Sequence, residues 1–259
     1  MPMQYTSADG IGVFTFDNGR LNLGNMALWQ QFYHHLLQFE QDDEVTVGVI
    51  TGKGGNFCAG DDLKEIRTEA WAQTATRWDR LLWARRRAKP MVAAANGYAL
   101  GGGFLALTLM ADIRIAGESL QTGAPEIAYG MGGISGATRL GLHVAPVDAA
   151  YLALTGEMIG AQQAVKMRLV NEVVPDDKTL ARAMEVAALI ARHPRLAVQT
   201  ELDCLHRGME LSRADAMHYA DHQYWQSRKM LGDGADTGHQ AIATIKKQKQ
   251  NQKEGEGDE

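Results

Sequence analysis

Cysteine, long apolar runs and an export signal are all missing or scarce in this chain of 259 residues. Its two cysteines, Cys58 and Cys204, belong to no CxxC pair, so the sequence offers no disulfide framework and no thiolate metal site. No apolar stretch is long enough to cross a bilayer, and the N-terminus lacks a basic region followed by an apolar run. We therefore expect no membrane span and a cytoplasmic location.

The chain also has no excess of positive charge. It carries 26 basic and 31 acidic residues, for a formal net charge of -5, which gives no general attraction to a phosphate backbone. One segment, RWDRLLWARRRAK (77–89), interleaves arginines with Trp78 and Trp83, a composition that RNA-binding surfaces share. At helical spacing we interpret it as a solvated face with aromatic anchors, and we expect no nucleic-acid partner.

Strands and helices alternate in the first half of the chain, whereas the second half is mostly helical. Hydrophobic periodicity predicts an α/β core followed by a helical extension. The predicted strands are residues 11–16, 45–51, 91–96, 112–117 and 169–174. The predicted helices are 25–41, 69–87, 104–110, 146–155, 160–167, 176–192, 195–207, 211–230 and 237–248. The polar last residues predict a disordered tail.

Glycine-rich segments invite three interpretations. TGKGG (51–55) has the wrong spacing for a P-loop. Gly101, Gly103 and Ala106 satisfy GxGxxA, but no acidic residue follows at the distance expected of a dinucleotide site. The loops 57–66 and 96–104 each bring backbone N–H groups to a strand end. If one N–H from each points at the same oxygen, they form an oxyanion hole; otherwise the glycines are turns and packing points.

Five motifs in order resemble the crotonase superfamily, also called the enoyl-CoA hydratase/isomerase family. They are FCAGDDLKEI, AANGYALGGGF, ADIRIAGES, GAPEIAYGM and LTGEMIGAQQAVKMRLVNEVVP. The resemblance implies the crotonase-type spiral of ββα units with a C-terminal helical extension, assembled as a homotrimer or hexamer. It also implies an acyl-CoA thioester substrate, whose enolate is stabilised by two backbone N–H groups. Coenzyme A is then the carrier part of the substrate, and no separate cofactor or metal is expected.

Matching positions assign roles to residues of this chain. The resemblance places the oxyanion donors at the N–H groups of Asp61 and Gly102, and contacts to the CoA part at Ala59, Gly60 and Lys64. Asp61 stands where the family commonly has alanine. We expect Asp62 to be a turn residue and Cys58 a small buried side chain.

Only one catalytic carboxylate is evident by motif. Glu126 matches one of the two glutamates that hydratases of this family use, whereas Leu105 stands at the position of the other. The spacing from the GGG motif to Asp112 is one residue longer than expected. A shift of the alignment by one residue does not supply the missing acid, because no acidic, histidine or tyrosine side chain occurs from Ala99 to Ala111. We expect an apolar pocket, with Phe104, Leu105 and Met131 as walls, to raise the pKa of Glu126.

A single carboxylate suffices to shift a double bond, by removing a proton from C2 of a 3-enoyl-CoA and returning it at C4. We therefore favour isomerisation, with hydration, carbon–carbon bond cleavage and a non-catalytic acyl-CoA-binding or RNA-binding homologue as alternatives. For the domains we predict a core at 1–195, a helical trimerisation region at 196–250 and a tail at 251–259.

Overall fold

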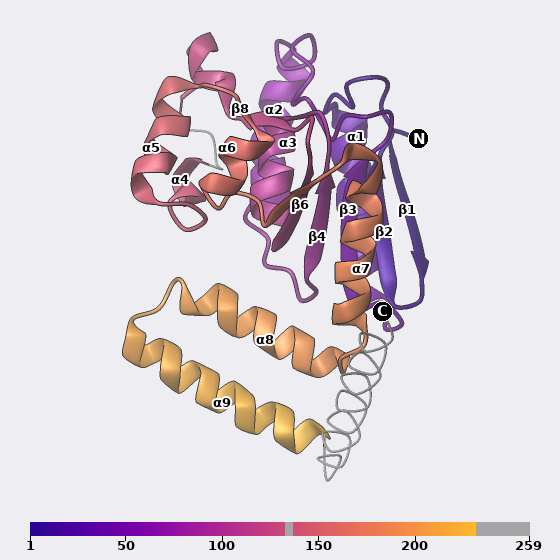
Figure 1. The fold of residues 1–259 in the computed structure, drawn as a ribbon, viewed down its shortest axis with the longest axis vertical. Coiled ribbons are helices and arrows are strands. Elements are labelled where there is room, and N and C mark those ends of the chain that lie inside the picture. Colours follow the sequence, from indigo (N-terminus) through magenta and orange to yellow (C-terminus); the bar gives the residue numbers. More distant parts are fainter. Residues whose placement is uncertain (133–136, 232–259) are drawn as a thin grey trace, which may run out of the picture. The chain divides into compact units, whose positions relative to one another are not determined.

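The computed structural model describes residues 1–132 and 137–231, except for the side chains of 74–80, 137 and 231. Its larger sheet has six strands in the order β1-β2-β3-β4-β6-β9; Figure 1 labels all of them except β9. The first two strands are antiparallel and all later neighbours are parallel. These strands are β1 (Met3–Ala8), β2 (Ile11–Phe16), β3 (Val47–Gly52), β4 (Met91–Ala95), β6 (Ile113–Gly117) and β9 (Glu172–Val174).

Helices cover both faces of this sheet, which explains why its central strands read as continuous apolar runs. Helix α7 (Thr179–Ala191) packs Ala183 and Ala187 against one face. On the other face α1 (Met26–Gln41) and the segment that starts with α3 (Gly102–Leu105) contribute to the main core. The mixed α/β fold with a parallel sheet that the sequence predicts is confirmed.

A second, three-stranded sheet lies in the order β5-β7-β8. Its strands are β5 (Tyr98–Leu100), β7 (Gln121–Gly123) and β8 (Ile159–Gly160). Around the two sheets lie α2 (Glu69–Trp78), η3 (Pro125–Tyr129), α4 (Ala137–Leu140), α5 (Pro146–Thr155), α6 (Ala161–Lys166) and η4 (Asp176–Lys178). Strand β5 leads directly into α3, so this small sheet positions the GGG segment.

The predicted helix 69–87 ends earlier than expected. Helix α2 passes into a π-helical turn, η1 (Asp79–Trp83), and the chain then leaves the helix. Beyond this turn two basic side chains are buried, which corrects the interpretation of 77–89 as a solvated face: Arg87 binds Asp112 at 2.9 Å, and the Lys89 ammonium donates to the carbonyl of Phe39 at 2.6 Å. Pro90 follows, and the residue before a proline disfavours helix.

The extra residue between GGG and Asp112 is absorbed by a π-helical turn, η2 (Ala106–Met110), which continues directly from α3. A π turn accommodates one more residue per turn than an α-helix. Leu105 precedes this turn, so its position relative to the glycines is that of an ordinary helix. The slip in spacing therefore falls after the candidate catalytic position.

The chain separates into two compact units, Met1–Leu202 and Asp203–Glu259. Helix α8 (Arg195–Gly208) spans this boundary, and α9 (Arg213–Leu231) lies in the second unit. The predicted boundary at 195/196 thus lies at the start of α8. The predicted helix 237–248 and tail 251–259 lie outside the described residues. None of the helices in the described ranges combines the length and hydropathy needed to span a membrane.

Candidate active site

The two glycine-containing loops lie side by side. Cys58 pairs with Ala99 in an isolated parallel bridge, in which the Cys58 N–H donates to the Tyr98 carbonyl at 2.8 Å and the Leu100 N–H to the Cys58 carbonyl at 3.0 Å. Gly101 then turns the chain into α3 with φ of 52°, a left-handed value that favours glycine. The structure thus places Asp61 and Gly102 next to each other, one from each loop.

Backbone pairing sets the direction of the two candidate N–H donors. Gly24 bonds to both neighbours of Asp61: its N–H donates to the Gly60 carbonyl, and its carbonyl accepts from the Asp62 N–H, each at 2.8 Å. The N–H of Asp61 itself must therefore point away from Gly24. Gly102 is the first residue of α3, where an N–H has no acceptor within the helix. Both donors belong to residues that line one cavity.

This cavity has a volume of about 680 Å³ and lies within the first unit. All six residues that the sequence assigns to the site line it: Ala59, Gly60, Asp61, Lys64, Gly102 and Glu126. Most other lining side chains are apolar, and three of them are indoles: Leu21, Leu23, Trp29, Leu63, Ile66, Trp71, Trp83, Leu100, Leu105, Pro125, Tyr129 and Met131. The structure therefore gathers the predicted residues in an apolar pocket.

Glu126 enters the cavity from η3. Its Oε1 lies 2.6 Å from the position that a Cβ on Gly101 would occupy, so Gly101 leaves room for the carboxyl group. Its Oε2 is buried and has no hydrogen-bond partner among the described residues. Burial raises the pKa of the Glu126 carboxyl above its usual range, because the charged form loses hydration. A carboxylate whose pKa is raised in this way is a stronger base than a fully solvated one.

Leu105 forms part of the cavity wall at the position where hydratases of this family have their other glutamate. Its side chain is 7% exposed and lines the cavity together with Met131, as the sequence predicts. Phe104, the third predicted wall, is fully buried in the main core and is not among the lining residues. Successive helical residues point about 100° apart, so only one of these two neighbours can face the cavity.

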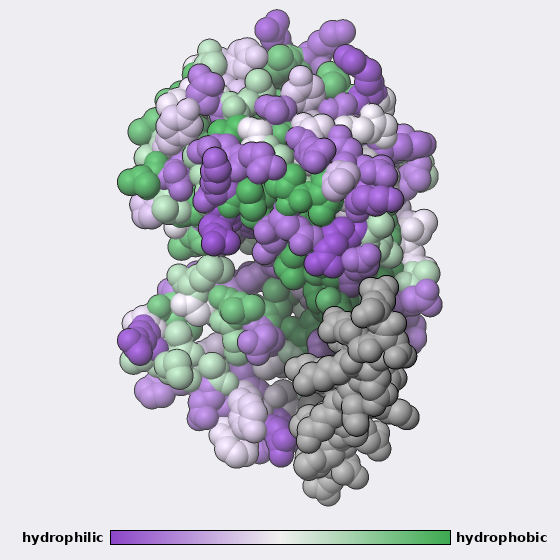
Figure 2. Space-filling model, viewed as in Figure 1, coloured by the Kyte–Doolittle hydropathy of each residue, from purple (hydrophilic) through white to green (hydrophobic). Residues whose placement is uncertain are grey.

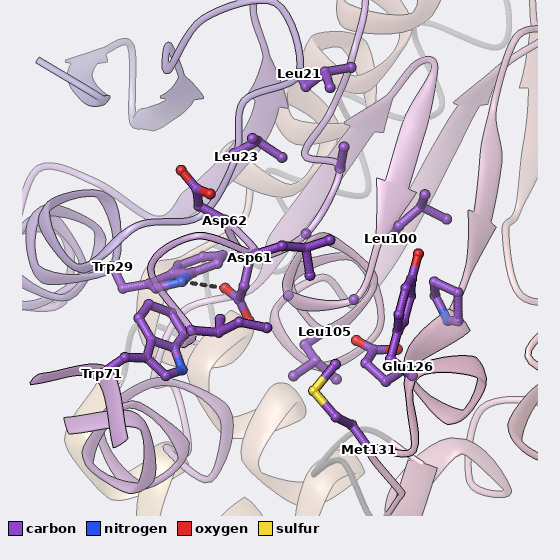
Figure 3. A pocket seen from close by; sticks show the side chains of 18 of the residues that line it. Leu21, Leu23, Trp29, Asp61, Asp62, Trp71, Leu100, Leu105, Glu126 and Met131 are labelled. Carbon is purple, nitrogen blue, oxygen red and sulfur yellow. Dashed lines mark hydrogen bonds between the residues drawn. The ribbon is translucent and has the colours of Figure 1, made fainter. Parts of the chain in front are cut away.

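A second carboxylate nevertheless reaches the cavity from Asp61. The indole N–H of Trp29 donates to Asp61 Oδ1 at 2.7 Å. Figure 3 shows Asp61 and Glu126 on opposite sides of the cavity, with Leu105 between them and Met131 below in this view. Sequence reasoning missed Trp29, because it lies on the apolar face of α1 and its spacing matches an ordinary core position.

Two neighbouring residues behave as the sequence predicts. The Asp62 carboxylate accepts from the Lys64 N–H at 2.9 Å, an Asx turn. Cys58 is fully buried, and desolvation raises the pKa of its thiol to about 12, which leaves it without thiolate character. Cys58 is therefore not suited to proton transfer. Among the described residues no group of three or more His, Cys, Asp or Glu side chains could hold a metal ion.

Comparisons with known proteins show what this chain is similar to. The family described as "Enoyl-CoA hydratase/isomerase" matches residues 6–242. The 2,3-dehydroadipyl-CoA hydratase of Escherichia coli is 41% identical over 194 residues, which cover 74% of this chain and 76% of that protein. The mevalonyl-coenzyme A hydratase of Aspergillus fumigatus is 34% identical over 218 residues, covering 81% and 79%.

A solved structure extends the likeness to the fold. An enoyl-CoA hydratase from Bacillus anthracis superposes with a TM-score of 0.87 at 28% identity, over 95% of this chain and 97% of that one. The fold, the five motifs and the sequence matches agree along most of the chain. This protein belongs to the enoyl-CoA hydratase/isomerase family, the crotonase superfamily, and is an acyl-CoA enzyme of that family.

Proposed function

We propose that the protein isomerises the double bond of a 3-enoyl-CoA to give the 2-enoyl-CoA, with Glu126 as the group that removes the C2 proton. One observation carries the proposal. The Glu126 carboxyl group, whose Oε2 is buried, faces the glycine turn, while apolar Leu105 occupies the wall where a hydratase would need its second glutamate. The cavity therefore favours proton transfer at carbon over addition of water.

The reaction needs an acceptor for negative charge as well as a base. When Glu126 takes the C2 proton, the electron pair of the C–H bond moves into the C1–C2 bond, and charge develops on the thioester oxygen. The N–H groups of Asp61 and Gly102 stabilise that charge when the oxygen lies between them. The N-terminus of α3 adds a favourable dipole at the same point.

Coenzyme A is the carrier part of the substrate in this proposal. Ala59 and Gly60 line the cavity beside the donor loop and can follow the chain of the carrier. Lys64 lies in the same loop with an exposed side chain, where its ammonium can meet a phosphate of the CoA nucleotide. No further cofactor is needed for a shift of a double bond. The trimeric or hexameric assembly and the cytoplasmic location stay predictions.

Product analysis in heavy water tests the proposal. A 3-enoyl-CoA should become the 2-enoyl isomer, and Glu126→Gln should abolish the conversion without loss of the fold, because the amide fills the same volume but accepts no proton. Formation of 3-hydroxyacyl-CoA from a 2-enoyl-CoA should be slow. If that product forms at about 10 per second or more, a rate typical of enzymes generally, isomerisation is not the main activity.

Hydration is the second candidate, and two observations favour it. The relatives described above are named hydratases. In addition, Asp61 brings a second carboxylate into the cavity, although from a different loop than the family glutamate. Hydration of a 2-enoyl-CoA by the parent, and its loss in Asp61→Asn, would decide for this candidate.

A further inference from the structure

Asp61 and Trp29 form a pair that the proposed one-base reaction does not use. Trp29 is 2% exposed, and its indole N–H bonds to the Asp61 carboxylate inside the cavity. Two glycines leave space for the pair. A Cβ on Gly24 would lie 2.4 Å from Trp29 Cζ2, and one on Gly102 would lie 2.8 Å from the same atom and 3.1 Å from Asp61 Oδ1. The Asp61 carboxyl group is therefore held beside the proposed oxyanion hole by close packing and a directed hydrogen bond.

The two carboxyl groups flank consecutive residues of the glycine turn. Glu126 Oε1 lies against Gly101, and Asp61 Oδ1 lies against Gly102. Figure 3 shows them reaching into the cavity from opposite sides. A substrate whose thioester oxygen rests at Gly102 would have its first acyl carbons between these two groups.

We propose that Asp61 is a second catalytic residue, which delivers a proton to C4 of the acyl group after Glu126 has removed one from C2, and that Trp29 is its positioning residue. This inference rests on the proposed isomerisation and deepens it. It replaces the return of one proton by Glu126 with transfers by two groups on opposite sides of the substrate.

The proton and electron balance closes without a further reactant when Glu126 starts as the carboxylate and Asp61 as the protonated acid, with its proton on Oδ2 because Oδ1 accepts from Trp29. Removal of the C2 proton leaves a dienolate with its charge on the thioester oxygen. That electron pair returns to re-form the thioester carbonyl, the C2–C3 bond becomes double, and the former C3–C4 double bond supplies the pair that binds the proton from Asp61. Glu126 then releases its proton to water, and Asp61 takes one up from water.

A deuterium label distinguishes proton transfer by Glu126 alone from proton transfer by Glu126 and Asp61 together. A 3-enoyl-CoA with deuterium at C2 should give a 2-enoyl product without deuterium at C4 when the reaction runs in light water, because the C4 proton comes from Asp61. A single shuttling carboxylate would carry part of the label from C2 to C4. Deuterium at C4 of the product, detected by mass spectrometry or NMR, would overturn the inference.

Variants supply the second readout, and exchange of the C2 hydrogen with solvent serves as the reference. Asp61→Asn keeps the volume and an acceptor for Trp29, so the fold should hold. Isomerisation should fall by about 100-fold, in the range of a lost acid–base group, while C2 exchange through Glu126 continues. Trp29→Phe should lower isomerisation and shift its pH profile, because Asp61 loses its N–H donor.

Glu65→Gln is the matched control. Glu65 lies in the same loop and its removal also deletes one negative charge, but it is not among the residues that line the cavity, and it accepts from the Met26 N–H at 2.8 Å. This variant should keep the parental rates of isomerisation and of C2 hydrogen exchange. Parental isomerisation in Asp61→Asn, or equal loss of exchange and isomerisation, would overturn the inference. A parent without either reaction would instead contradict the proposed function.

Discussion

Glu126 places a carboxyl group where its charged form is poorly solvated, and this has a consequence for stability as well as for chemistry. Burial raises the pKa of the carboxyl in the folded state, whereas unfolding exposes it to water. The folded protein therefore binds the proton more tightly than the unfolded chain does. The stability that the folded protein gains from this tighter proton binding is complete at pH values below the pKa of Glu126 in the unfolded chain. It is lost as the pH rises through the pKa of Glu126 in the folded protein.

Glu126→Gln should therefore be more stable than the parent at neutral pH, because a neutral amide avoids the cost of burying a charge. The difference should disappear when the pH falls below about 4.3, the usual glutamate pKa, where the parent carboxyl is neutral in both states. Urea unfolding curves at several pH values measure this. A variant that is less stable at every pH would show that Glu126 has a structural role that burial does not reveal.

The role of the Gly102 backbone N–H can be separated from the steric effect of a side chain at this position. Gly102→Pro removes the donor, and loss of one such donor costs about 2.7–4 kcal/mol in the transition state. Any side chain at this position also approaches Trp29, since a Cβ would lie 2.8 Å from Cζ2. Gly102→Ala introduces the same Cβ but keeps the N–H. We expect the proline variant to have the lower kcat of the two, and equal kcat values would remove Gly102 from the oxyanion hole.

Residue-level sequence reasoning predicted which residues come together, whereas the catalytic roles assigned to them stay predictions. Asp61, Gly102 and Glu126 lie together around one cavity, as the order of the loops predicts. The partnership of Trp29 with Asp61 could not be predicted, because it joins residues 32 positions apart through side-chain directions that the fold alone determines. The absence of an acid at Leu105 could be predicted, since it depends only on residue types.

At the level of elements, strands β2, β3, β4 and β6 and the short β9 were predicted, whereas β1 and the three strands of the small sheet were not. The sequence of β1, MQYTSA, has only Met3 buried, so it lacks the alternation that marks a strand. Strands β5, β7 and β8 have two or three residues each, too few for any period to emerge. Their pairing depends on contacts between distant segments. The small sheet that positions the glycine turn was therefore missed.

The π-helical turn η2 gives a prediction at this scale. Deletion of Leu109 should let the turn join α3 as a regular helix, because a π turn holds one extra residue. We expect a loss of about 1–3 kcal/mol, or a Tm lowered by about 2–12 °C for a chain of this size. Thermal unfolding followed by circular dichroism measures the shift.

Deletion of His34 provides the comparison. His34 is an exposed residue in the middle of α1, and its loss would rotate the following part of the helix by about 100°. Leu36 and Phe39, both fully buried, would then leave the core. This deletion should abolish cooperative unfolding. If both deletions are equally harmful, the extra residue in η2 has a role beyond spacing.

For the whole molecule, the open question is what covers the apolar surface of the C-terminal helices. Figure 2 shows hydrophobic side chains among hydrophilic ones on their visible face. In the second unit the exposed large apolar residues include Met209, Leu211, Met217, Tyr224, Trp225 and Met230. Surfaces of this kind usually mark contact sites between proteins. From the family resemblance we expect the partner to be another copy of the chain.

We therefore expect a trimer or hexamer, and light scattering at micromolar concentration measures it. A monomer would contradict the prediction, whereas deletion from Asn251 onward should leave the assembly unchanged. Trp225→Glu should lower the mass, because it places a charge on apolar surface that is 56% exposed in the single chain. Gln226→Glu adds the same charge at the neighbouring exposed position without removing apolar area, and it should keep the parental mass. If both substitutions dissociate the assembly alike, charge in α9 rather than burial of Trp225 controls association.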